Sequence, residues 1–146
     1  SENIGIGSSA LQSNTTGSKN IGIGLRAGIY IADGVTFNSI TNTSVYIGAD
    51  TKALANNQTN QIVIGYGATG AGSNTATIGN TSIKKTVLGG VIAHSTSYTV
   101  ATLPTGALGD TAFVTDAVDP RYLGALTGGG SVACPVFHNG TNWVSH

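Results

Sequence analysis

The chain has 146 residues, of which 8% are charged, and its six basic and six acidic residues cancel. This balance gives no electrostatic footprint for nucleic acid or an anionic membrane, and we expect neither partner. Polarity comes instead from Asn, Thr, Ser and Gln, which suits a fibrous or extracellular surface better than a cytosolic enzyme. Cys134 is the single cysteine, so no disulfide can form within one chain.

No stretch approaches the roughly twenty apolar residues that a membrane span needs, so membrane insertion is not expected. The sequence also contains no Met. We therefore expect residue 1 not to be a translation start, and an upstream part such as an attachment region to precede it.

A five-residue pattern occurs five times in the first eighty residues. Each copy has a polar first residue, a small or branched apolar second, a variable third, and then Ile and Gly. The copies span residues 3–7, 20–24, 44–48, 61–65 and 75–79. Side chains alternate along a strand, so the second and fourth positions share one face, and the closing Gly permits a positive φ at the following turn. Short strands repeated at near-regular intervals predict a β-solenoid or β-roll.

Small residues follow the repeat glycines by three positions, at Ala10, Ala27, Thr51, Ala68 and Ser82. The glycines themselves stand at positions 7, 24, 48, 65 and 79, so the intervals are 17, 24, 17 and 14 residues. The long interval contains an insertion at 29–42, for which we expect a loop or an extra hairpin. Tyr30, Tyr46 and Tyr66 are expected to pack between chains or to cover the roll.

A single narrow roll buries little apolar surface and leaves unpaired backbone at both ends. Assembly of three chains about a common axis is the economical solution, because each chain then buries one face against two copies. A homotrimer is therefore expected.

The composition changes after a junction at 78–92, because all three prolines and the single Trp lie beyond it. We place the boundary at 92/93, with a repeat-built β shaft at 1–92 and a β-sandwich-like knob at 93–146. Strand composition is found at 97–103, 111–115, 132–137 and 141–144, and Asn139-Gly140 is a strong hairpin signal. No stretch has helical periodicity, so the predicted class is all-β.

Two groups of residues resemble known families. The Asn-Ile-Gly-Ile-Gly copies resemble the head repeats of trimeric autotransporter adhesins, and residues 78–89 are similar to the segment that closes such repeats in bacteriophage tail fibres. The segments 109–117, 128–130 and 135–143 are similar to the tips of phage tail fibres and tailspikes. The resemblance implies a homotrimer that forms the distal part of the tail fibre of a virion, outside the cell. The tip of this fibre would bind a host polysaccharide (capsule or lipopolysaccharide).

Catalysis is not expected. The chain has three His residues and a single Glu, Glu2, and none of the His or Asp residues stands in a nucleophile elbow or a metal-binding spacing. The aspartates at 110, 116 and 119 lie in turn-like sequence rather than as a facing carboxyl pair. We therefore expect no catalytic residues, no metal site and no cofactor.

Carbohydrate binding requires an aromatic face for sugar C–H groups and planar polar groups for hydroxyls. A loop after Pro120 and the hairpin at Asn139 provide these residue types, although a lone Trp in the last strand is also a natural core residue. The candidate ligand-binding residues are Arg121, Tyr122, His138, Asn139, Asn142 and Trp143.

These observations predict a non-enzymatic receptor-binding fragment of a phage tail fibre that attaches to bacterial polysaccharide. The alternatives are the non-catalytic tip of a polysaccharide depolymerase tailspike, a bacterial trimeric adhesin head, and a spacer without a ligand. The adhesin head should be followed by a coiled-coil stalk, and the chain instead ends without heptads.

Overall fold

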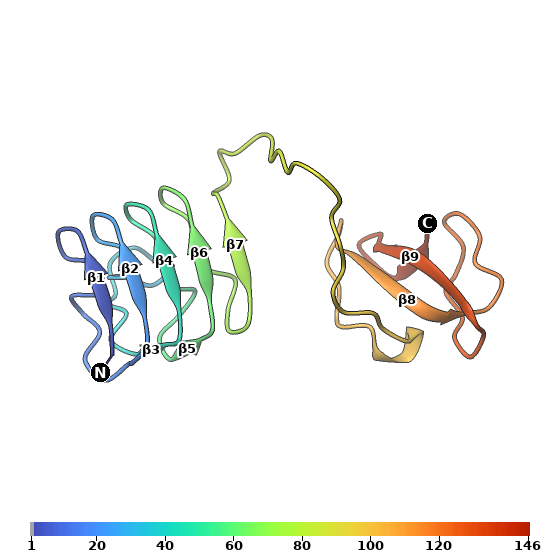
Figure 1. Ribbon diagram of the computed structural model, residues 1–146, viewed down its shortest axis with the longest axis horizontal. Helices are drawn as coiled ribbons and strands as arrows, with labels where there is room; N and C mark the ends of the chain where they lie inside the picture. The colour runs from blue at the N-terminus through green and yellow to red at the C-terminus, as the bar shows by residue number, and fades with distance from the viewer. Residues whose placement is uncertain (1) are drawn as a thin grey trace. The chain divides into compact units, whose positions relative to one another are not determined.

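The computed structural model describes residues 2–146 and divides the chain into two compact units, Ser1–Val87 and Leu88–His146. We call these the repeat unit and the C-terminal unit. The division falls slightly before the boundary expected from the sequence. Strands and loops make up both units, which confirms the all-β class (Figure 1). Within residues 2–146, no helix is long and apolar enough to cross a membrane.

The repeat unit is a β-solenoid in which each copy of the pentapeptide pattern forms one short strand. The five strands are parallel and neighbour one another in the order β1-β2-β4-β6-β7. Their bounds are β1 (Ile4–Ile6), β2 (Ile21–Ile23), β4 (Val45–Ile47), β6 (Ile62–Ile64) and β7 (Ala76–Ile78). Equivalent positions lie in register, as with Ile21, Val45 and Ile62. The predicted solenoid is therefore confirmed.

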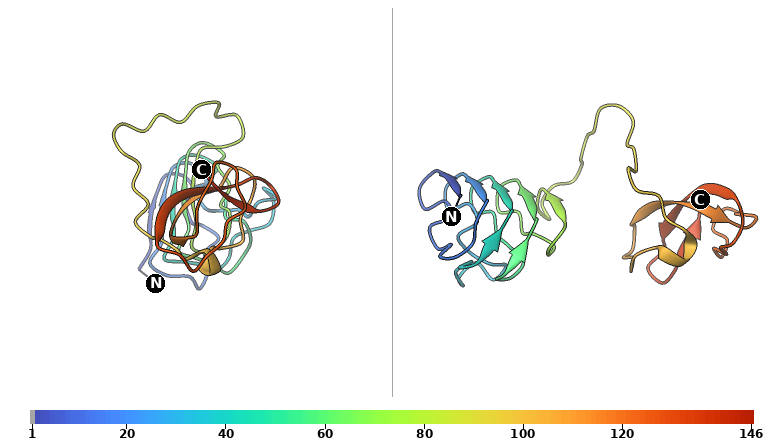
Figure 2. Two further views of the ribbon diagram at one scale, coloured as in Figure 1. Left: turned by 90° about the vertical axis from the view of Figure 1, so that its right-hand side faces the viewer. Right: turned by 60° about the horizontal axis from the view of Figure 1, so that its bottom comes forward.

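A second, two-stranded parallel sheet adds to the solenoid. It pairs β3 (Thr41–Asn42) with β5 (Gln58–Thr59). Figure 2 shows the coils winding around a common interior, with the five-stranded sheet forming one side.

The interior of the solenoid is filled by the third position of the repeat. Tyr46 and Val63 occupy this position and are completely buried. Glycine makes room beside them, because a Cβ at Gly22 would lie 2.7 Å from Leu11 Cγ and one at Gly28 would lie 2.9 Å from Tyr46 Cδ2. The prediction that Tyr46 covers the roll or packs between chains is wrong, because the alternation of the strand turns this position inward.

The polar first positions of the first four repeats form a hydrogen-bonded ladder along the stack. Asn20 Nδ2 donates to Asn3 Oδ1 at 3.0 Å, and Ser44 N donates to Asn20 Oδ1 at 2.9 Å. Gln61 N then donates to Ser44 Oγ at 3.1 Å. These contacts give partners to buried backbone and side-chain groups where one coil passes to the next, whereas the buried side-chain amide of Gln61 has no hydrogen-bond partner among the described residues.

The second and fourth positions of the strands point outward. We call this surface the isoleucine face, defined by its six exposed isoleucines. Their exposed fractions are 54% for Ile4, 58% for Ile6, 37% for Ile23, 37% for Ile47, 42% for Ile62 and 65% for Ile78. An apolar stripe of this kind along a sheet is unusual for a surface that faces only water.

The glycine that closes each strand is required by the backbone. Gly48 has a φ of 123°, and a Cβ there would lie 2.9 Å from the carbonyl carbon of Gly65 in the next coil. The predicted positive φ is confirmed. The residue three positions later is small because it faces the interior, as Ala27, Thr51 and Ala68 show by their complete burial.

The insertion at 29–42 contains a hairpin, one of the two forms expected, and ends in β3. Tyr30 pairs with Phe37 in an antiparallel bridge, and Ile31 N donates to Thr36 O at 2.9 Å. The Asp33 carboxylate holds the turn by accepting from Val35 N at 2.9 Å, Thr36 N at 2.8 Å and Thr36 Oγ1 at 2.6 Å.

The C-terminal unit contains one antiparallel sheet with the order β10-β9-β8. Its strands are β8 (Thr111–Ala117), β9 (Val132–His138) and β10 (Trp143–Ser145). The β9–β10 hairpin pairs His138 with Trp143 around Asn139-Gly140, as the sequence predicted. The sheet packs its buried residues against Tyr98, Val100, Leu103 and Leu126 from loops and a short helix. The sandwich-like layering of this knob stays a prediction.

The strand predicted at 97–103 is wrong. This segment makes one bridge between Tyr98 and Val114 and then forms the 3₁₀ helix η1 (Val100–Thr102). Hydrogen bonds to side chains cause the change: Asp116 Oδ1 accepts from Val100 N at 2.7 Å, and Thr102 Oγ1 accepts from Thr99 N at 3.0 Å. Local bonds of this kind compete with sheet pairing.

Candidate functional site

The loop that follows β8 is held against β10 at the C-terminal end of the chain. Leu123 N donates to Ser145 O at 2.9 Å, and Ser145 N donates to Gly124 O at 3.2 Å. The Ser145 hydroxyl also donates to the carbonyl of Arg121. These bonds give the loop a defined path although it belongs to no sheet.

A hollow of about 540 Å³ lies between this loop and β10, and we call it the tip groove. Its size lies within the usual range for sites that bind small molecules. Five of its six lining residues are of apolar type, and the sixth is an asparagine. It is lined by Leu123, Ala125, Leu126, Asn142, Trp143 and Val144.

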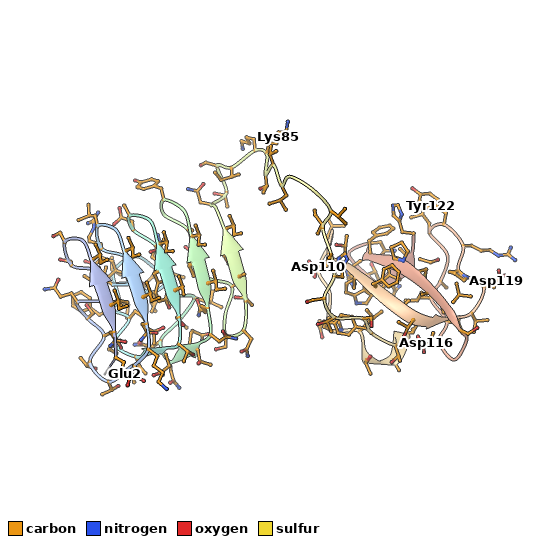
Figure 3. All side chains as sticks on the ribbon, viewed as in Figure 1. Glu2, Lys85, Asp110, Asp116, Asp119 and Tyr122 are labelled. Atoms are coloured by element: carbon orange, nitrogen blue, oxygen red, sulfur yellow. The ribbon has the colours of Figure 1, made fainter. Side chains whose placement is uncertain are left out.

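Arg121 and Tyr122 project from the same loop but do not line the tip groove. Arg121 Nη2 lies 2.8 Å from Asp119 Oδ2 in a pair whose two side chains are largely exposed. The Tyr122 ring is 73% exposed, and its centroid lies 5.6 Å from that of His146 at an interplanar angle of 83°. Figure 3 shows Asp119 and Tyr122 on this loop of the unit. Both candidates are therefore accessible to a ligand.

His138 and Trp143 pack against each other inside the unit. Their ring centroids lie 5.4 Å apart in an edge-on arrangement, and His138 is buried. His138 Nδ1 accepts from Gly140 N at 3.2 Å, while Trp143 Nε1 donates to the Pro104 carbonyl at 2.9 Å. Both rings thus have structural contacts, and of the two only Trp143 lines the groove.

The two asparagines of the hairpin have different positions. Asn139 Oδ1 accepts from the backbone N–H groups of Thr141 and Asn142, each at 2.9 Å, which fixes the turn. The same bonds delay the start of β10 to Trp143, two residues after the strand predicted at 141–144. Asn142 lines the tip groove.

The structure thus brings Asn142 and Trp143 into one hollow, places Arg121 and Tyr122 on the adjoining loop, and uses His138 and Asn139 for packing and turn formation. Sequence reasoning missed Leu123, Ala125 and Leu126, which line the same groove. The available signal was three apolar residues crowded into a short loop between Pro120 and Gly128.

The aspartates considered for catalysis hold turns. Asp110 Oδ2 accepts from Ala107 N at 2.8 Å. Asp116 accepts from Val100 N through Oδ1 and from Gly129 N through Oδ2, the latter at 3.2 Å. Both carboxylates therefore have backbone partners in the C-terminal unit. In the part of the chain that the structure describes, no group of three or more His, Cys, Asp or Glu side chains is arranged to hold a metal ion.

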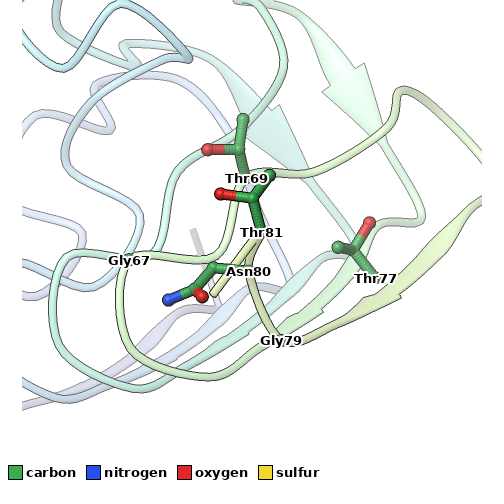
Figure 4. A pocket seen from close by; sticks show the side chains of 6 residues that line it. All are labelled: Gly67, Thr69, Thr77, Gly79, Asn80 and Thr81. Carbon is green, nitrogen blue, oxygen red and sulfur yellow. The ribbon is translucent and has the colours of Figure 1, made fainter. Parts of the chain in front are cut away.

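Another hollow lies at the last coils of the solenoid (Figure 4). It measures about 370 Å³ and has a small-residue, hydroxyl-rich lining. Its amide side chain already has protein partners, because Asn80 Nδ2 donates to Tyr66 O at 2.6 Å and Asn80 Oδ1 accepts from Ser82 N at 2.8 Å. The lining residues are Gly67, Thr69, Thr77, Gly79, Asn80 and Thr81.

Comparison of the chain with protein-family models, with curated proteins and with solved structures gives no match.

Proposed function

We propose that this chain is a non-enzymatic receptor-binding part of a phage tail fibre, which assembles as a homotrimer and attaches to bacterial surface polysaccharide. The repeat unit acts as the shaft, and the C-terminal unit acts as the adhesive end. The observation that carries the proposal is the isoleucine face, because a repeat-built β structure with an apolar stripe along its length suits assembly into a fibre.

Leaving the isoleucine face in water is unfavourable for a single chain. Ile4, Ile6 and Ile78 are each more than half exposed, and Ile62 is 42% exposed. Burial of apolar surface stabilises an assembly by roughly 25 cal/mol per Å². Because the stripe repeats from coil to coil, a second copy aligned along the same direction contacts it over the whole stack.

Copies related by rotation about an axis parallel to the stack all run in the same direction, whereas the two copies of an antiparallel dimer do not. We therefore favour a trimer over such a dimer. Parallel copies have their chains running in one direction, which a fibre with one attached end and one free end requires. The face is only three residues wide, as in Ile21–Ile23, so one chain presents a narrow ridge. Three such ridges meet around one axis, and this arrangement agrees with the state that the family resemblance implies.

The tip groove and its loop offer the groups that carbohydrate binding requires. Tyr122 offers an exposed aromatic ring, Arg121 offers planar N–H donors, and Asn142 offers an amide in the groove. Such sites are individually weak. Three copies on one fibre raise the avidity through effective concentration without any deep pocket.

The oligomeric state is tested by sedimentation velocity at micromolar concentration. The wild-type chain is expected to sediment as a trimer, and the double variant Ile23→Glu/Ile47→Glu as a monomer, because charge on this face opposes burial. Val35→Glu is the matched control, since Val35 is 75% exposed on the inserted hairpin and away from the face. A monodisperse wild-type monomer would refute the assembly.

Attachment is tested with fluorescently labelled wild-type protein on a panel of bacteria, each with and without its capsule or lipopolysaccharide. Binding that disappears with the polysaccharide is the expected result. Binding that persists on stripped cells points to a protein receptor, and no binding across the panel leaves the chain as a spacer; either result contradicts the proposal.

A further inference from the structure

A second groove lies on the side of the solenoid, where the inserted hairpin folds beside the first coils. It measures about 540 Å³, and we call it the lateral groove. Most of its lining side chains are polar, and two are aromatic. They are Ser9, Gln12, Ser13, Thr15, Arg26, Ile29, Tyr30, Phe37 and Ser39. We propose that this groove is a sugar-binding site for a neutral oligosaccharide, separate from the tip and belonging to the shaft.

The aromatic part of the groove comes from the hairpin. The rings of Tyr30 and Phe37 stack with centroids 5.5 Å apart and an interplanar angle of 10°. The Phe37 side chain is 55% exposed, although its neighbour Asn38 is completely buried and fixes the strand end. A flat apolar ring that is held in place and open to solvent is the surface against which the C–H face of a sugar ring packs.

The hairpin is ordered, so this ring is preorganised. The Asp33 carboxylate binds three donors across the turn, and Asn38 N donates to Ile29 O at 2.9 Å. Hydrogen bonds from the Thr36 hydroxyl and from the backbone N–H groups of Val35 and Thr36 lower the pKa of Asp33, which keeps the carboxylate charged and the turn closed. A fixed aromatic surface loses little freedom when a ligand binds.

The polar part of the groove comes from the turn after β1. Within residues 2–146, the side chains of Ser9, Gln12 and Ser13 make no hydrogen bond to another protein group, while their turn is tied to the hairpin by Thr15 N to Ser39 O at 2.9 Å. Two hydroxyls and one amide therefore face the hollow with free donors and acceptors. Sugar hydroxyls, which both donate and accept, match these groups.

The charge of the groove favours a neutral ligand. Arg26 is the single charged residue in the lining, and its Nε lies 2.7 Å from Asp50 Oδ1. The pair is partly exposed and cancels the cation, so an anionic sugar gains little there. The other N–H groups of the guanidinium are left to donate to a hydroxyl or ring oxygen.

The lateral groove is longer than a single sugar ring. A smaller hollow of about 200 Å³ shares Arg26 and Tyr30 with it and is also lined by Gly34, Asp50 and Lys52. The two hollows share Arg26 and Tyr30, so a ligand of more than one sugar residue spans both. The smaller hollow adds one cation, Lys52, whose ammonium group already donates to the carbonyl oxygens of Asp50 at 3.2 Å and Gly67 at 3.4 Å. The inserted hairpin that provides the aromatic side of this groove occurs in a single repeat interval.

The inference deepens the proposed polysaccharide attachment and is tested on an array of purified bacterial capsular and O-antigen polysaccharides, neutral and uronate-containing. Phe37→Leu keeps an apolar side chain but removes the aromatic face, and Gln12→Ala removes an amide without touching the hairpin. Each is expected to weaken binding to a neutral polysaccharide about five-fold, the size of a lost hydrogen bond or stacking contact. Val35→Ala, on the same hairpin but outside the lining, is expected to bind as the wild type does.

The outcomes separate the two proposals. If the wild type binds polysaccharide and Tyr122→Ala alone weakens it, the lateral site is overturned while attachment through the tip stands. Preference for uronate-containing polysaccharides overturns the assignment to a neutral ligand. If the wild type binds nothing on the array, both proposals fail. Loss of binding in Gln12→Ala and in Phe37→Leu with unchanged melting temperatures supports the lateral site.

Discussion

The hydroxyl groups of Tyr46 and Thr41 lie 2.9 Å apart inside the solenoid, and both side chains are completely buried. Tyr46 fills the interior with its ring, while its hydroxyl finds a partner from β3 in the same coil. This contact joins the five-stranded sheet to the two-stranded sheet through the interior. A buried hydroxyl is tolerated there only because it is paired.

Tyr46→Phe is expected to destabilise the repeat unit by about 1–3 kcal/mol, because Thr41 Oγ1 then stays buried without its partner. Hydrogen–deuterium exchange of peptides spanning β2 to β6 measures the effect in this unit alone. Tyr66→Phe is the control: its side chain is 72% exposed, and the expected change lies within about 0.5 kcal/mol. Equal exchange in the two variants would show that the hydroxyl contact contributes nothing.

The same residue makes stability depend on pH. Burial raises the pKa of Tyr46 above its usual value of about 10, an effect that outweighs the hydrogen bonds from Thr41, Ser44 and Asn38. The folded chain therefore keeps a proton that the unfolded chain loses. This contribution is complete below pH 10 and declines as the pH rises toward the pKa of the folded state.

Alkaline unfolding checks this expectation. The free energy of unfolding of the wild type should fall more steeply above pH 10 than that of Tyr46→Phe, and the two slopes should agree near neutral pH. Parallel slopes over the whole range would mean that Tyr46 titrates alike in the folded and unfolded chains.

Substitution of a repeat glycine should be far more harmful than substitution of the hairpin glycine. Gly48→Ala combines a φ of 123° with a Cβ 2.9 Å from backbone in the next coil, so we expect a loss of about 2 kcal/mol or more. Gly34→Ala has a φ of 75° and open space around its Cβ, so about 1 kcal/mol is expected. Urea unfolding of the two variants gives the comparison, and the reverse ranking would exclude close coil contact as the cause.

How far the sequence predicts this structure depends on the range of the interactions. The pentapeptide places the second and fourth positions on one face of each strand, but alternation alone does not say which face is inside. Gly5 and Gly22 at the third position gave no hint of a core in the first copies. Tyr46 and Val63 show which face is inside, because both are completely buried in one cluster with Leu11 and three alanines.

The tip groove was less predictable because long-range bonds build it. The bond from Leu123 N to Ser145 O joins residues 22 positions apart in the chain. No local sequence pattern predicts such a bond, whereas the turn at Asn139-Gly140 is encoded by adjacent residues and was predicted. The strand prediction at 97–103 was wrong for a related reason, since the path of this segment depends on the hydrogen bond from Val100 N to Asp116 Oδ1.

Alanine substitutions at Trp143 and Tyr122 should distinguish a core residue from a surface residue in the C-terminal unit. Trp143→Ala removes the ring that packs on His138 and the donor to Pro104, and we expect a loss of about 2–4 kcal/mol. Tyr122→Ala should leave the melting temperature nearly unchanged because its ring is mostly exposed. Differential scanning calorimetry measures both, and an equally stable Trp143→Ala variant would place Trp143 among surface residues.

Cys134 provides a probe of how the C-terminal unit opens. Its side chain lies in the buried cluster with Val114 and Val136, and burial raises the pKa of the thiol above its usual value. Both effects lower the amount of accessible thiolate, which is the species that reacts with disulfide reagents.

At pH 8, labelling of Cys134 by 5,5′-dithiobis(2-nitrobenzoic acid) is therefore expected to be slow and limited by opening of the sheet. Trp143→Ala should accelerate labelling in proportion to its loss of stability, whereas Tyr46→Phe, in the repeat unit, should not change the rate. Rapid labelling of the native wild type would show that β9 is open to solvent.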